Sequence, residues 1–152
     1  MKDIVLKITG KVLSALPKDP MNPANSDDAV ELITAGKLSS RGGITRISYE
    51  ESEISGMQGC TTQITISEKA GTVKLRRSGI TTGDIDEMEF EKGTRYEGTY
   101  STPFGDIDIE LMTADIDFSE FNSEKKKISM DYYLAMKGLS ETHNRLELEV
   151  LQ

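Results

Sequence analysis

The chain has 152 residues, of which 36% are hydrophobic and 29% are charged, and its formal net charge at pH 7 is −8. Phosphate backbones are bound by clustered lysines and arginines, so this acidic balance argues against a nucleic-acid partner. No run reaches the roughly 18 consecutive apolar residues of a spanning helix, and no membrane-crossing helix is expected. The length suits one domain with one core, and we assign residues 1–152 to it.

Apolar and polar residues alternate with a period of two along most of the chain, for example at Ile4, Leu6 and Ile8. Only a strand with one buried and one wet face needs this spacing. The pattern predicts nine or ten strands, over residues 3–16, 28–39, 44–53, 60–67, 72–78, 84–91, 94–101, 106–118, 126–137 and 142–151.

Most connections between these segments are short. Arg41-Gly42-Gly43 and Thr102-Pro103-Phe104-Gly105 are tight-turn sequences, because glycine and proline each fix a turn position. Parallel strands need long, usually helical crossovers, and none is visible. Closing a sheet into a barrel removes its exposed edges. The sequence therefore predicts an all-β fold, an antiparallel meander barrel of about 8–10 strands.

The segment 106–118 changes its apolar phase part-way along. Ile107, Ile109 and Leu111 alternate in one phase. The other phase is followed by Met112, Ala114, Ile116 and Phe118. One extra residue in a strand produces such a slip. We therefore predict a β-bulge near Leu111.

A set of local sequences spread along the chain resembles the YwiB-like family. These are Tyr49-Glu50-Glu51-Ser52, Ser55-Gly56-Met57, Thr61-Thr62, Phe90-Glu91-Lys92-Gly93, Tyr100-Ser101-Thr102-Pro103-Phe104-Gly105, Gly138-Leu139-Ser140 and Asn144. The resemblance implies a bacterial protein of unknown function with a calycin-like, lipocalin-related β-barrel that can hold a cavity. It implies no catalytic residues.

Several polar residues share the phase of their apolar neighbours and are expected to face the barrel interior. A mostly apolar pocket with a few polar groups is the usual composition of a small-molecule site. The candidate ligand-binding residues are Tyr49, Glu51, Thr62, Arg77, Tyr96, Tyr100, Tyr132 and Asn144.

Glu51 and Arg77 are the charged members of this set. An unpaired buried charge is costly, so the two either pair with each other or bind the polar end of a ligand. Arg77 suits a carboxylate or phosphate, which a guanidinium binds through two hydrogen bonds. Alternatively, both lie near strand ends and reach water, or form a salt bridge that closes the barrel. The tyrosines also have two possible roles: they can line a ligand pocket, or they can fill the barrel as ordinary core residues.

Other chemistry finds little support in the sequence. Cys60 is the only cysteine, so no intramolecular disulfide is possible, and its alternation with apolar neighbours predicts a buried core residue. The N-terminal segment lacks the uninterrupted apolar core of a signal peptide, and we expect a soluble, cytoplasmic protein. The single histidine, His143, is expected to be exposed, and zinc needs more ligands than the chain offers. Asp106, Asp108 and Glu110 lack the spacing of a calcium loop and are read as a solvated face. We assign no metal, no cofactor and no catalytic residue.

Three functions remain open at this level. The first is binding of a small amphipathic or hydrophobic ligand in the barrel lumen. The second is a filled barrel that acts through its acidic surface or as a homo-oligomer, for which an exposed strand edge would permit a homodimer. The third is a hydrolase that uses Glu51 with a second carboxylate such as Glu53.

Overall fold

The computed structural model describes residues 2–16, 29–50, 61–78, 87–102, 105–122 and 125–151. Ten strands occupy these residues: β1 Lys2–Leu16, β2 Ala29–Arg41, β3 Ile44–Glu50, β4 Thr61–Ser67, β5 Thr72–Ser78, β6 Met88–Glu91, β7 Arg95–Thr102, β8 Gly105–Asp117, β9 Lys126–Met136 and β10 Ser140–Val150. No helix among them is long and apolar enough to cross a membrane.

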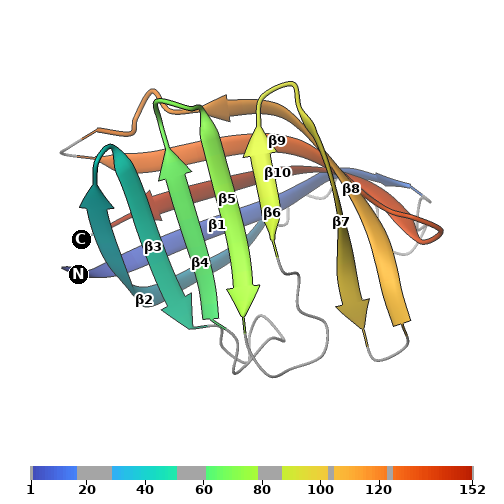
Figure 1. The fold of residues 1–152 in the computed structure, drawn as a ribbon, viewed down its shortest axis with the longest axis horizontal. Coiled ribbons are helices and arrows are strands. Elements are labelled where there is room, and N and C mark those ends of the chain that lie inside the picture. The colour runs from blue at the N-terminus through green and yellow to red at the C-terminus, as the bar shows by residue number, and fades with distance from the viewer. Residues whose placement is uncertain are drawn as a thin grey trace.

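The strands form one antiparallel sheet in the order β6-β5-β4-β3-β2-β1-β10-β9-β8-β7. The first and last strands, β1 and β10, pair in the middle of this order, and the edge strands β6 and β7 approach each other. In Figure 1, β3 to β6 form the near wall, and β1, β9 and β10 form the far wall. The predicted antiparallel meander barrel is confirmed.

The barrel is nearly closed at a seam between β6 and β7. β6 pairs with β5, and β7 pairs with β8. The Lys92-Gly93 turn joins the two sides at one end, where Gly93 has a φ of 78° and its N–H donates to the Thr113 carbonyl at 2.9 Å. A glycine accepts this left-handed conformation without steric cost. The turn closes with a bond from the Thr94 N–H to the Glu91 carbonyl at 2.9 Å, so β6 and β7 are joined at this end only through the turn.

Alternation places the core inside the barrel, as predicted. β3 and β4 bury every second residue, and Ile47, Ile64 and Ile66 are at most 2% exposed. Leu6 on β1 and Ile128 on β9 meet them from the far wall and are equally buried. These β-branched and leucine side chains suit a pleated surface packed on one face.

The predicted bulge in β8 is present and lies slightly further along the strand than expected. The register shifts between Thr113 and Asp115, not at Leu111. Thr113 is fully buried, whereas Met112 is 36% exposed. The inward phase thus continues through a threonine, which hydropathy alone assigns to the wet face. A second bulge, between Val12 and Ser14 of β1, was not predicted.

The hydroxyl oxygen of Thr113 is buried and has no hydrogen-bond partner among the described residues. A buried hydroxyl left unpaired costs about 1–3 kcal/mol. We therefore expect Thr113→Val to raise the free energy of unfolding by about 1 kcal/mol in urea titrations. The control is Thr62→Val, because Thr62 is equally buried but its hydroxyl is hydrogen-bonded to Arg77. A loss of stability in Thr113→Val would contradict the assignment of an unpaired hydroxyl.

Candidate functional site

Three predicted site residues form a row across adjacent strands on the inward face of the barrel. Tyr49 on β3 lies opposite Thr62 on β4, and Thr62 lies opposite Arg77 on β5. Tyr49 is 7% exposed, Thr62 is fully buried, and Arg77 is partly buried. The Arg77 Nε–H donates to Thr62 Oγ1 at 3.3 Å. The row therefore brings a positive charge to the inner wall beside a buried hydroxyl.

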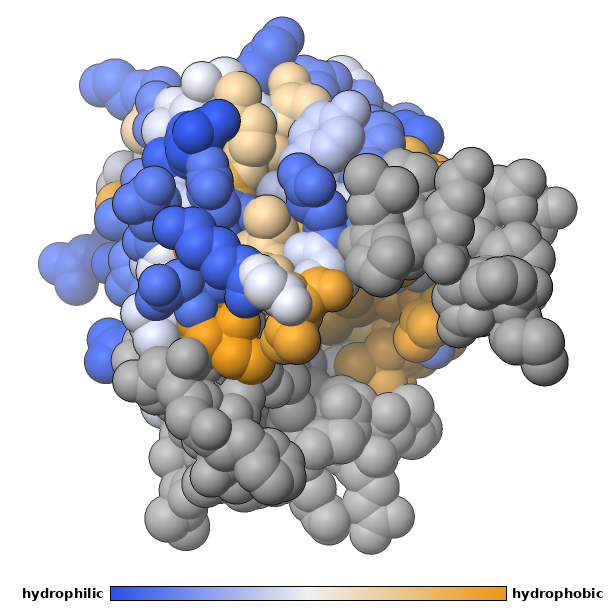
Figure 2. All heavy atoms as spheres, turned by 90° about the vertical axis from the view of Figure 1, so that its right-hand side faces the viewer, coloured by the Kyte–Doolittle hydropathy of each residue, from blue (hydrophilic) through white to orange (hydrophobic). Residues whose placement is uncertain are grey.

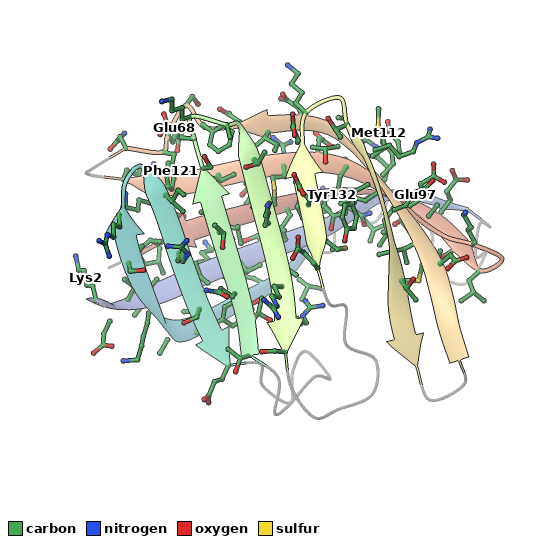
Figure 3. All side chains as sticks on the ribbon, viewed as in Figure 1. Lys2, Glu68, Glu97, Met112, Phe121 and Tyr132 are labelled. Atoms are coloured by element: carbon green, nitrogen blue, oxygen red, sulfur yellow. The ribbon has the colours of Figure 1, made fainter. Side chains whose placement is uncertain are left out.

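Tyr132 reaches the same interior from β9 and lies behind β6 in Figure 3. Its ring packs edge-on against Phe90, with 5.1 Å between ring centroids and an interplanar angle of 74°. Burial raises the pKa of Tyr132, and the positive charge of Arg77 partly opposes this shift. Tyr132 is therefore a neutral phenol at physiological pH and lies within the electrostatic reach of Arg77.

Two further candidates make local hydrogen bonds. The Tyr96 hydroxyl donates to the Glu87 carbonyl at 2.7 Å and so ties β7 to the start of β6 across the seam. Asn144 donates through Nδ2 to Thr142 Oγ1 on its own strand at 2.8 Å. Both side chains are partly buried. Tyr96 therefore holds the barrel closed, and Asn144 stabilises the inner face of β10.

Five residues singled out in the sequence lie outside this description. Glu51, Glu53 and Cys60 fall outside the described residues, and Tyr100 on β7 and Asp106 on β8 have side chains that are not described. The expected pairing of Glu51 with Arg77 and the burial of Cys60 therefore stay predictions.

Apolar side chains are visible at the end of the barrel away from the two termini. Figure 2 looks at this end and shows hydrophobic side chains gathered around a hollow. The β9–β10 hairpin lies at this end (Figure 1). Nearby inward-phase residues Leu134, Met136 and Leu146 pack on the core but are only partly buried. Among the described residues, the apolar side chains at this end are therefore less buried than those of the core.

The profile of a domain of unknown function, DUF1934, matches residues 18–148. The chain belongs to this family. The crystal structure of the YwiB protein from Bacillus subtilis is similar over 99% of this chain and 94% of that one, with a TM-score of 0.65 and 20% sequence identity. No curated protein matches the chain. The resemblance to the YwiB-like family is confirmed, and at this identity the solved structure supports the fold alone.

The DUF1934 barrel also contains a polar cluster on its outer wall that sequence reasoning missed. His143 Nε2 lies 2.8 Å from Asp131 Oδ1, and its ring stacks on Tyr133 with centroids 4.3 Å apart. The side chain of His143 is only 25% exposed, so its expected exposure was wrong. The strand register explains this, because Tyr133 lies opposite His143 and covers it. Spacing along the chain carries no signal for such a cross-strand contact.

Proposed function

We propose that this barrel binds a small amphipathic molecule in its lumen, with an anionic group of the ligand near Arg77. The observation that carries the proposal is an arginine on the inward face of a mostly apolar barrel, hydrogen-bonded to the buried Thr62. A guanidinium recognises carboxylate and phosphate groups through paired charge-assisted hydrogen bonds. The neutral Tyr132 hydroxyl adds a donor on the opposite wall.

The apolar part of the ligand would occupy the end of the lumen near the β9–β10 hairpin. Leu134, Met136 and Leu146 offer flexible apolar surface there, and methionine adapts readily to ligands of different shape. A small-ligand site is typically a mostly apolar cavity with a few polar groups that fix orientation. An anion at Arg77 with an apolar chain toward that end fits this composition.

Native mass spectrometry of the purified protein, compared with its denatured mass, tests the proposal first. The expected result is a small-molecule adduct that is lost on denaturation, or a thermal shift on adding dodecanoate. Dodecanol is the matched probe, since it keeps the chain and lacks the charge. No adduct and no shift with either compound would sink the proposal and favour a filled barrel that acts through its surface.

A cytoplasmic location is part of the same proposal, supported by the single cysteine, which leaves no intramolecular disulfide. The alternative of a hydrolase that uses Glu51 with Glu53 stays a prediction, because both residues lie outside the described part of the chain.

A further inference from the structure

The outer face of β3, β4, β5 and the adjoining end of β2 has an excess of positive charge, and we call it the basic wall. Its strands β3 to β5 face the viewer in Figure 1. The outward side chains of this wall include one carboxylate, Glu50, and five cations. The cations are Lys37, Arg41, Arg46, Lys74 and Arg76. Because 26 acidic residues outnumber 18 basic ones in the whole chain, the basic wall reverses the overall balance.

The outward side chains of β7 to β10 have the opposite sign. Those that the structure describes include nine carboxylates and three cations. β9 and β10 lie on the far side of the barrel from β3 to β5 (Figure 1). Packed sheets are about 10 Å apart, and side chains on their outer faces are further apart still. The Debye length at physiological salt is about 8 Å, so the acidic side does not cancel the field in front of the basic wall.

The three central cations of the basic wall are exposed to solvent. Arg46, Lys74 and Arg76 form no ion pair with another residue in the described ranges. Arg46 lies opposite Thr65, and Thr65 lies opposite Lys74. Adjacent strands are about 4.8 Å apart, and alternate residues of one strand are about 7 Å apart. The cations are therefore spread over three strands, which suits a surface of repeated anions more than a single anion.

The composition of the basic wall favours a lipid surface over a nucleic acid or a protein. Tyr49 is the only aromatic residue of β3, β4 and β5, and it is buried in the interior. Single-stranded nucleic acids bind through bases stacked on aromatic side chains, and protein interfaces are enriched in aromatic residues and methionine. The outward side chains between the cations are instead Ser48, Gln63 and Thr65. A bilayer of anionic lipids presents many phosphate groups and attracts clustered lysines and arginines through charge alone.

We propose that the basic wall attaches the barrel reversibly to the surface of an anionic lipid bilayer. Each lysine or arginine near such a surface adds to the attraction, and the attraction falls off within a Debye length. The inward side chains of the same strands, among them Thr62 and Arg77, stay inside the barrel. Attachment therefore does not need a ligand in the lumen, and its failure would leave the proposed lumen site untouched.

Co-sedimentation with phosphatidylcholine vesicles, prepared with and without phosphatidylglycerol, tests the attachment. We expect binding only to the vesicles that contain phosphatidylglycerol. Raising NaCl from about 0.1 M to about 1 M shortens the Debye length from about 10 Å to about 3 Å and is expected to release the protein. Equal binding to both kinds of vesicle, or binding to neither, would overturn the proposal.

Charge reversal tests which wall makes the contact. Lys74→Glu is expected to lower the partition coefficient at least about tenfold, and Lys74→Gln, which only removes the charge, by a smaller factor. Lys137→Glu is the matched control, because it makes the same change in net charge at an exposed lysine of the β9–β10 turn. Circular dichroism establishes that each variant is folded.

An equal loss of binding in Lys74→Glu and Lys137→Glu would contradict the proposal, because net charge alone would then explain it. Polyglutamate and duplex DNA serve as alternative polyanions. If either binds the chain in a Lys74-dependent manner while the vesicles do not, the partner is a macromolecule and the bilayer is rejected.

Discussion

Replacing Arg77 by leucine is expected to weaken dodecanoate binding by about 10- to 100-fold, since a hydrogen bond to a charged group contributes about 1.5–3 kcal/mol. Affinity for dodecanol should change by less than about threefold, because the apolar lumen beyond the arginine is unaltered. The measurement is isothermal titration calorimetry, or displacement of a fluorescent fatty acid, with both compounds on both proteins.

The neighbouring residue provides the control. Arg76 has the same charge and sits next to Arg77 on β5, but it belongs to the opposite phase and is exposed. Arg76→Leu should leave both affinities nearly unchanged. If Arg76→Leu and Arg77→Leu weaken dodecanoate equally, the effect is one of overall charge. If neither does, Arg77 has no role in ligand orientation, although the lumen itself can still bind.

The comparison of Arg76 with Arg77 also shows how far sequence reasoning reaches. Phase along one strand is local information, and it was enough to assign Arg77 to the inner wall with Val73 and Leu75. The same reasoning predicted the strands and the barrel, because each strand carries its own alternation. Where a side chain was assigned to the inner or outer face from its hydropathy alone, the assignment was wrong, as for Met112 and Thr113.

Which residues of different strands meet in the folded barrel cannot be predicted from the sequence of any one strand. Thr62 lies between Tyr49 and Arg77 only because two hairpin registers combine. Tyr132 joins them because β9 crosses the far wall, and His143 is covered because Tyr133 lies opposite it. A one-residue register change would move every one of these side chains to the other face of the sheet.

Phe90→Ala is expected to have the largest effect on stability, lowering the free energy of unfolding by about 3–5 kcal/mol. Phe90 is fully buried, belongs to the four-residue β6 and packs edge-on against Tyr132. Its loss leaves a cavity beside the seam, where few ladder bonds are available to hold β6. For a domain of about 150 residues this corresponds to a fall in Tm of roughly 10 °C.

Tyr133→Ala is the matched control for this truncation. It removes an aromatic ring from β9 next to Tyr132, but that ring is 47% exposed and stacks on His143. Its expected cost is below about 1 kcal/mol, as for most surface changes. Urea titrations that follow tyrosine fluorescence and circular dichroism together give both values.

A cost for Phe90→Ala as small as that for Tyr133→Ala would mean that β6 does not close the barrel. The wall opposite Tyr132, and with it the proposed lumen, would then be lost. A large cost that dodecanoate partly reverses would instead place the ligand against the cavity that Phe90 had filled, since a ligand stabilises only the state it binds.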